Sequence, residues 1–289
     1  MRIEVKDLTY VYSEKSKALA VKALDRVSLT VEEGEFFGII GHTGSGKTTF
    51  VQHLNGLIKI GKDKGSIKIG EYDLTDKKCD FMGLRAKVGM VFQYPEYQLF
   101  AETVKDDVAF GVKNFNKGLT DEQIESMVKL AIEKVGLDYE KVKDKSPFEL
   151  SGGQKRRVAI AGVIVTRPEV LVLDEPAAGL DPVGKREFLE LLKSLHGDFV
   201  KTIILVSHDM NLVAENCSKV AVFSKGKITA VGTPKEVYND YKNIERLGLD
   251  LPCTAYLEKE LKERGVALDS DLTEYGFVNA LVNEIKGDK

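Results

Sequence analysis

The sequence has few cysteines, no long apolar run and no excess of basic residues. Cys79, Cys217 and Cys253 are odd in number and widely scattered, so the sequence indicates neither a disulfide framework nor a zinc site. Apolar runs such as 158–165 are far shorter than the ~18 residues that a membrane-spanning helix needs. The first seven residues alternate charged and apolar side chains, and we expect no signal-peptide core there.

The charge balance limits the class of partner. Lys and Arg number 42 against 45 Asp and Glu, which gives a formal net charge of −3. Nucleic-acid binding normally needs a basic face, because the ligand is a chain of phosphates, so we expect no nucleic-acid partner. The 43% of hydrophobic residues is ordinary for a folded protein, and 289 residues suffice for one large domain plus an appendage.

Short apolar segments typical of buried strands occur on both sides of a helical region that covers about 95–166. Residues 1–34 also alternate as strands do, and 65–72 reads as a further β segment. This order predicts an α/β core with an inserted helical subdomain, the whole domain ending near residue 240. The expected buried strands are 36–40, 88–92, 170–173, 202–206 and 220–223.

Residues 241–289 are predicted to be helical only. Leu257 and Leu261 share one helix face, and Glu258–Lys262 and Glu260–Arg264 are spaced for ion pairs. Thr273 is a candidate cap for a last helix. The apolar positions of that helix recur at i, i+3, i+4 and i+7, namely Val278, Leu281, Val282 and Ile285. Since this tail is too small for its own core, these stripes pack either on the same chain or on a partner.

A phosphate-binding loop follows the strand 36–40 and precedes a predicted helix. Its residues fit the pattern G-x-x-x-x-G-K-[ST], in which glycines let backbone N–H groups surround the phosphates. We expect Lys47 to reach the β- and γ-phosphates of ATP and Thr48 to bind Mg²⁺. The predicted ATP-binding residues of this segment are Gly41, His42, Thr43, Gly44, Ser45, Gly46, Lys47, Thr48 and Thr49.

Two adjacent carboxylates end the apolar strand 170–173. Side chains alternate along a strand, so Asp174 and Glu175 should point in different directions. Asp174 is then suited to the Mg²⁺ shell, through water, and Glu175 to the attacking water. The alternative for strand-end acids is that they only cap a following helix.

A second glycine-rich segment, Leu150-Ser151-Gly152-Gly153-Gln154, opens another predicted helix. These residues resemble the signature of the ABC ATPase family, and other motifs of that family follow the expected order. Gln93 occupies the position of the Q-loop glutamine, a catalytic residue and Mg²⁺ ligand. Asp181 resembles the D-loop aspartate and His208 the switch histidine. Tyr12 resembles the aromatic residue that stacks on adenine, with Tyr10 as the alternative.

The resemblance, which covers about residues 1–235, implies the P-loop core of an ABC ATPase with an antiparallel β subdomain, an inserted helical subdomain and a C-terminal helical extension. It also implies a head-to-tail pair in which Ser151, Gly152, Gly153 and Gln154 contact the ATP held by the partner. His208 could instead cap the next helix. The side chains of His42, His53 and His196 have no predicted role.

Residues 92–100 and the segment 248–252 resemble the ATPases of energy-coupling factor transporters. Within that family, Gly41-His42-Thr43-Gly44 and Gln93-Tyr94-Pro95-Glu96 resemble the second ATPase, A-prime. This resemblance implies a heterodimer with a related ATPase, although a homodimer is possible. It also implies a transmembrane T subunit, a substrate-capturing S subunit for vitamins or transition-metal ions, and a place on the cytoplasmic face of the membrane. The alternatives are another class of ABC transporter, a soluble ABC protein, or a nucleotide-binding scaffold without hydrolysis.

Overall fold

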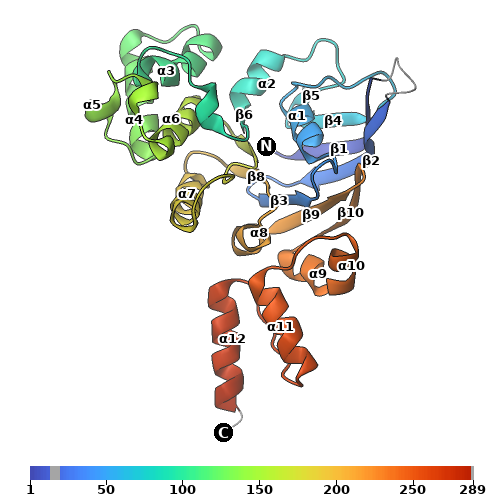
Figure 1. Ribbon diagram of the computed structural model, residues 1–289. Helices are drawn as coiled ribbons and strands as arrows, with labels where there is room; N and C mark the ends of the chain where they lie inside the picture. Colours follow the sequence, from blue (N-terminus) through green and yellow to red (C-terminus); the bar gives the residue numbers. More distant parts are fainter. Residues whose placement is uncertain (14–19, 288–289) are drawn as a thin grey trace.

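The computed structural model describes residues 1–13 and 20–287, and its centre is a six-stranded sheet (Figure 1). The strand order is β10-β9-β3-β8-β7-β6; β10 is antiparallel to β9 and all other neighbours are parallel. Alternation along β3 sends Phe36 and Ile40 into one core and Phe37 and Ile39 into the other. The strands are β3 (Phe36–Gly41), β6 (Val88–Val91), β7 (Val170–Asp174), β8 (Thr202–Val206), β9 (Lys219–Ser224) and β10 (Lys227–Gly232).

A four-stranded antiparallel sheet covers one face of this central sheet. Its order is β2-β1-β4-β5, and Ile3 of β1 pairs with Val31 of β2 and with Ile69 of β4. Ile3 and Ile69 share a core with Phe37 of β3 and Phe50 of α1, so α1 lies between the two sheets. The strands are β1 (Ile3–Tyr12), β2 (Val21–Val31), β4 (Ser66–Ile69) and β5 (Tyr72–Asp73).

The region between β6 and β7 contains helices only, as predicted. Ser151 caps α6 in a capping box with Gln154, and Thr120 caps α4 in the same way with Gln123. The fold class predicted from the sequence is confirmed. The elements of this region are η1 (Pro95–Gln98), α3 (Val104–Phe115), α4 (Asp121–Lys134), α5 (Tyr139–Val142), η2 (Pro147–Glu149) and α6 (Gly152–Ile164).

Further helices surround the central sheet. Among those not predicted is α2 (Phe81–Lys87), because seven residues show no clear apolar period. Its start is marked by Asp80, whose side chain accepts hydrogen bonds from the Met82 and Gly83 amides. The others are α1 (Lys47–Leu54), α7 (Pro182–Leu195), α8 (Met210–Asn216), α9 (Pro234–Asn239) and α10 (Tyr241–Arg246).

The last two helices, α11 (Cys253–Glu263) and α12 (Glu274–Gly287), project away from the sheets side by side (Figure 1). As predicted, Thr273 caps α12: its hydroxyl accepts a hydrogen bond from the Gly276 amide at 2.9 Å. Glu260 and Arg264 pair at 3.8 Å. The predicted pair of Glu258 with Lys262 is wrong, because Glu258 is buried and accepts hydrogen bonds from Ser270 instead.

The predicted apolar stripes of this extension are largely exposed. Leu257 of α11 and Val278, Val282 and Ile285 of α12 all lie at the surface.

Within the described part of the chain, no helix is long and apolar enough to cross a membrane.

Candidate active site

The loop between β3 and α1 takes a path that needs glycine at two points. Gly41 has φ 149° and Gly46 has φ 105°. A Cβ atom on Gly41 would lie 2.3 Å from the Phe223 carbonyl oxygen, and one on Gly46 would lie 2.4 Å from the Ala23 carbonyl oxygen. No larger side chain fits at either position, so the backbone can approach a ligand here without side-chain obstruction.

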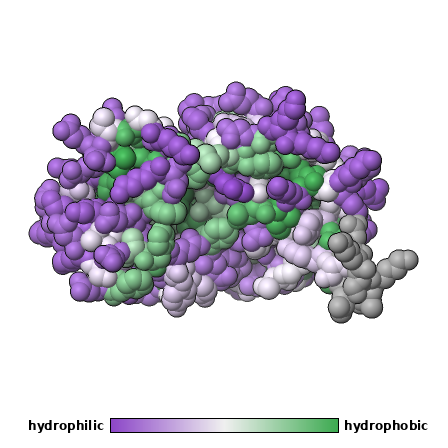
Figure 2. All heavy atoms as spheres, turned by 90° about the horizontal axis from the view of Figure 1, so that it is seen from above, coloured by the Kyte–Doolittle hydropathy of each residue, from purple (hydrophilic) through white to green (hydrophobic). Residues whose placement is uncertain are grey.

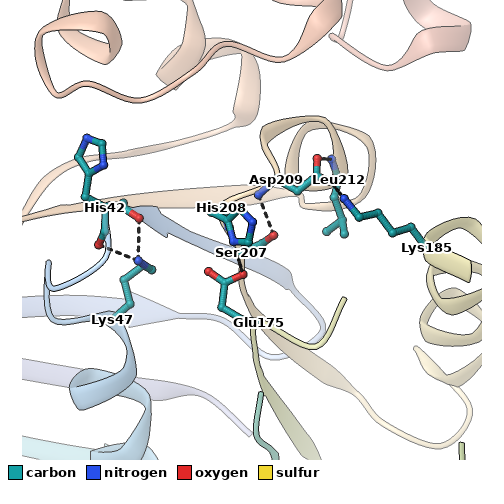
Figure 3. Close-up of polar contacts among 9 residues, drawn as sticks. His42, Lys47, Glu175, Lys185, Ser207, His208, Asp209 and Leu212 are labelled. Atoms are coloured by element: carbon teal, nitrogen blue, oxygen red, sulfur yellow. Dashed lines mark hydrogen bonds and ion pairs between the residues drawn. The ribbon is translucent and has the colours of Figure 1, made fainter. Parts of the chain in front are cut away.

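Lys47 lies inside this loop. It is buried, and its Nζ donates hydrogen bonds to the carbonyl oxygens of Gly41 at 2.6 Å and His42 at 2.9 Å (Figure 3). Burial lowers the pKa of Lys47, while the nearby charges of Glu175 and Asp174 act in the opposite direction. The Lys47 side chain therefore lies at the N-terminus of α1. Its charge and the helix dipole both favour a bound anion at this position.

The two carboxylates at the end of β7 have different environments. Asp174 is buried beside the Thr48 side chain. Burial raises the pKa of Asp174, and the charge of Glu175 adds to this effect. Glu175 leaves the strand with φ 50°, and its amide donates to the Val206 carbonyl at 3.0 Å. The chain therefore changes direction between the two acids.

The position of Asp174 fits a bound Mg²⁺ ion. Its Oδ1 atom is buried and has no hydrogen-bond partner among the described residues. An unpartnered carboxylate oxygen beside the Thr48 hydroxyl is the oxygen-rich environment that Mg²⁺ prefers. Gln93 is exposed after β6, and the described contacts do not join it to Asp174 or Thr48.

His208 lies directly against Glu175. Its Nδ1 atom is 2.7 Å from Glu175 Oε2. Asp209, and not His208, caps α8, because Asp209 Oδ1 accepts a hydrogen bond from the Leu212 amide at 3.2 Å. Lys185 of α7 pairs with the second Asp209 oxygen at 2.8 Å (Figure 3). His208 is thus free of a capping role and faces the same space as Glu175.

Two tyrosines lie at the side of α1. Tyr12 is 40% exposed, and its hydroxyl lies 3.1 Å from the Thr49 hydroxyl. Tyr10 packs edge-on between Tyr12 and the buried His53, with ring centroids 4.8 and 5.0 Å apart. Tyr12 therefore offers the more accessible ring beside the phosphate loop.

The signature segment is open to solvent. A Cβ atom on Gly152 or Gly153 would meet no other atom within 4 Å. The Ser151 and Gln154 side chains bond each other's backbone amides at 3.3 and 3.0 Å, so they are used in capping α6. Asp181 likewise caps α7, through the Gly184 amide at 2.7 Å.

Arg156, which was not predicted, connects the signature helix to two other motifs. It is buried, and it forms two hydrogen bonds to the Glu96 carboxylate at 3.0 and 3.1 Å and one to the Ala178 carbonyl at 3.1 Å. Glu96 lies three residues after Gln93, and Ala178 three before Asp181. The available signal was spacing: Arg156 lies four residues before the buried Ile160 and so on the inner face of α6.

Comparison with known proteins agrees with this geometry. Residues 24–178, more than half of the chain, match the family model described as ABC transporter. The chain is 51% identical over 272 residues to the energy-coupling factor transporter ATP-binding protein EcfA2 of Clostridium tetani, which covers 94% of this chain and 93% of the relative. It is 50% identical over 273 residues, with the same coverage, to the protein of that name from Clostridioides difficile.

Solved structures show the same fold. One is cbiO1 from Clostridium perfringens, part of the ABC transporter complex cbiONQ, with 37% identity, a TM-score of 0.73 and coverage of 89% of this chain and 98% of the other. Another is a dimeric ATP-binding cassette in a post-hydrolysis state with ADP and Pi, with 27% identity, a TM-score of 0.70 and coverage of 80% and 97%. The chain therefore belongs to the ABC transporter family of ATP-hydrolysing proteins, among the ATP-binding subunits of energy-coupling factor transporters.

Proposed function

We propose that this chain binds MgATP on its phosphate loop, hydrolyses it at an interface with a second ATPase, and thereby powers an energy-coupling factor importer. One observation carries the proposal. Lys47, Asp174, Glu175 and His208 converge on one site, whereas the signature glycines of the same chain are bare and solvent-exposed. A second anion-binding helix end with nothing bound from its own chain is suited to the phosphates held by another.

The residues of the site have distinct roles in this proposal. Lys47 exchanges its two carbonyl partners for the β- and γ-phosphates, and Tyr12 stacks on the base. Thr48, Gln93 and Asp174 would hold Mg²⁺, and the bound ion would neutralise phosphate charge. Glu175 orients the attacking water and accepts its proton. In this proposal His208 carries a proton on both ring nitrogens, so that Nδ1 donates to Glu175 and Nε2 to the γ-phosphate.

The second ATPase contributes its own signature residues to this site. In return, the signature of this chain, Ser151, Gly152, Gly153 and Gln154, contacts the ATP bound to the second ATPase. Asp181 lies in the loop that carries the contact between the two sites. A non-identical partner is favoured by the EcfA2 name of the relatives, which indicates a numbered pair. The exposed stripe Val278, Val282 and Ile285 on α12 gives the pair a contact outside the nucleotide sites.

A membrane subunit has a suitable docking place on the face that Figure 2 shows, where hydrophobic residues gather between two more polar lobes. A cleft of about 310 Å³ lies between α2, β6 and α6. Leu57, Phe92 and Val163 are among its lining residues, and they come from the end of α1, the segment after β6 and α6. An amphipathic helix of a T subunit fits an apolar groove of this kind.

In this proposal the chain is a peripheral protein on the cytoplasmic face of the membrane. The T subunit transmits the movement of the ATPases, and an S subunit captures the cargo, a vitamin or a transition-metal ion. The chain itself contacts ATP and Mg²⁺ and not the cargo.

Purification of the tagged chain from detergent-solubilised membranes tests the proposal. We expect mass spectrometry to identify a related ATPase and two integral membrane proteins. Leu57→Asp should lose the membrane proteins, because a carboxylate in an apolar groove is unfavourable. Val231→Asp is the matched control, since Val231 on β10 is equally exposed but far from the cleft. Purification of only ribosomal or nucleic-acid components would contradict the proposal.

A further inference from the structure

The helix that follows His208 is fixed to the rest of the domain at its first turn. Asp209 caps α8 and pairs with Lys185 of α7 at 2.8 Å. Asp209 and His208 are adjacent in the chain, so any displacement of α8 also displaces the imidazole that lies 2.7 Å from Glu175. The position of α8 therefore sets the geometry between His208 and Glu175.

The first residues of both long helices of the C-terminal extension are hydrogen-bonded to side chains of α8. Asn211 Oδ1 accepts a hydrogen bond from the Cys253 amide, the first residue of α11, at 2.7 Å. A Glu215 carboxylate oxygen accepts one from the Glu274 amide, the first residue of α12. Asn211 and Glu215 lie four residues apart and so on one face of α8.

These two contacts satisfy backbone groups that helix ends leave without a partner. The N-cap residue of α11 is Pro252, which has no side-chain cap, so Asn211 supplies the missing acceptor from another helix. The Glu215 carboxylate at the start of α12 is also favoured by the helix dipole. Breaking either contact leaves a backbone amide without its hydrogen-bond acceptor, which is unfavourable. The two contacts therefore stabilise the position of α8 relative to the extension.

The two contacts belong to one connected unit. The Thr254 hydroxyl of α11 donates to the Leu272 carbonyl at 2.7 Å, and the buried Glu258 accepts from the Ser270 amide at 3.1 Å. These bonds join α11 to the segment that leads into α12. The extension therefore holds α8 at two points through a single packed body, and not through two independent helices.

The extension also reaches the phosphate loop. A Cβ atom on Gly248, between α10 and α11, would lie 2.8 Å from His42 Nε2, so the imidazole packs against bare backbone there. In Figure 3 the His42 side chain points away from Lys47. One face of the loop thus holds Lys47, and the other contacts the extension.

We propose that the C-terminal extension is a positioning element of the ATPase site, and that Asn211 and Glu215 are the positioning residues through which it holds α8 and His208. The proposal rests on the role of His208 given above. ATP bound at the phosphate loop and at His208 should in turn change the environment of the first turns of α11 and α12, because the coupling is reciprocal.

The test is the double variant Asn211→Ala/Glu215→Ala of the full-length chain in its purified complex. We expect kcat to fall about 5-fold or more with KM for ATP unchanged within about 2-fold, because the phosphate loop and Tyr12 are untouched. The pair Asn211→Asp/Glu215→Gln keeps both acceptor oxygens and should restore turnover. Lys235→Ala is the control, since it removes the Lys235–Asp269 ion pair between the main domain and the extension without touching α8.

Hydrogen exchange supplies a readout that does not depend on turnover. In the wild type, ATP should change the protection of amides 253–256 and 274–277, and the double variant should lose this response while binding ATP normally. Wild-type kcat and an unchanged response in the double variant would overturn the inference. His208→Ala separates the two proposals. If it abolishes hydrolysis while the double variant turns over normally, only the coupling fails; if it leaves hydrolysis intact, the site assignment and the inference both fail.

Discussion

The chain contains two helix N-termini suited to anions, and they differ in almost every other respect. The start of α1 is enclosed, with a buried cation, Lys47, already bonded to the loop at 2.6 and 2.9 Å. The start of α6 is exposed, has no cation inside it, and presents Gly152 and Gly153 to solvent with nothing within 4 Å of a Cβ position.

The difference shows which end can bind a nucleotide unaided. At α1 the protein supplies backbone amides, a cation and, beside them, the Asp174 oxygen that lacks a partner. At α6 the Ser151 and Gln154 side chains are used in the cap, so the segment offers mainly backbone and the dipole. We therefore propose that the first end is a binding site and that the second is one half of a site that another chain completes.

The largest effect is expected for a substitution of Glu175, which belongs to the site at the start of α1 and not to the one at the start of α6. Glu175→Gln keeps the size of the side chain but removes its ability to accept a proton. Turnover should fall by ~10²-fold or more while ATP binding remains. Steady-state hydrolysis and equilibrium binding by the purified assembly measure both. Glu190→Gln on the exposed side of α7 is the control, and turnover of Glu175→Gln within a few-fold of wild type would contradict the role assigned to Glu175.

Gly153→Asp tests the α6 end directly. The carboxylate would repel the γ-phosphate of a partner's ATP, so hydrolysis by the pair should fall by about 100-fold. ATP binding by the separate chain should stay unchanged, because the phosphate loop is intact. Gly118→Asp is the matched control, since that glycine also has open space around it. Weaker binding by the Gly153→Asp monomer would show that the signature acts within its own chain.

Lys47→Ala tests the opposite end and should reverse the pattern. Loss of charged hydrogen bonds, about 1.5–3 kcal/mol each, should weaken ATP binding by the separate chain by roughly 10- to 100-fold. Isothermal titration of the monomer is the measurement. If Lys47→Ala and Gly153→Asp changed monomer binding equally, the distinction between the two helix ends would be lost.

The contact between the two ATPases should also depend on α12. Val282→Asp places a charge in the exposed apolar stripe, and we expect the pair to dissociate at about 10-fold higher concentration in nucleotide-free buffer. Asn283→Asp adds the same charge one residue away, off the stripe, and should have no effect. Light scattering of both variants in nucleotide-free buffer measures the association of the two ATPases. Equal association would show that the stripe is not part of the interface.

The smallest effect is expected for Arg156→Lys, which weakens the link between the signature helix and the Gln93 segment. Lysine keeps the charge but cannot form two parallel bonds to Glu96. Hydrolysis should fall by about 3-fold, with monomer ATP binding unchanged. A matched change at the partly exposed Arg157, Arg157→Lys, should leave hydrolysis as it is, and equal behaviour of the two variants would contradict a connecting role for Arg156.

Local signals were sufficient for the motifs and for most elements. The phosphate loop, the strand-end acids and the helix opened by the signature segment are each defined by a few consecutive residues, and the structure has them where the sequence predicted. The helix α2 was missed because it is too short to show a period. Glu258 was assigned to a surface ion pair because spacing within a helix does not show which residues pack against that helix. In the structure Ser270 packs there and donates a hydrogen bond to Glu258.

The sequence by itself determined the α/β fold, the order of the motifs and the chemistry of each, because glycine placement, apolar alternation and capping act within a few residues. Only the tertiary structure decided which distant residues meet. His208, after β8, reaches Glu175 at the end of the neighbouring strand β7, and Arg156 joins Glu96 to Ala178. Asn211 and Glu215 hold the starts of α11 and α12. Such contacts depend on how helices and strands pack, and that packing has no signature at short sequence separation.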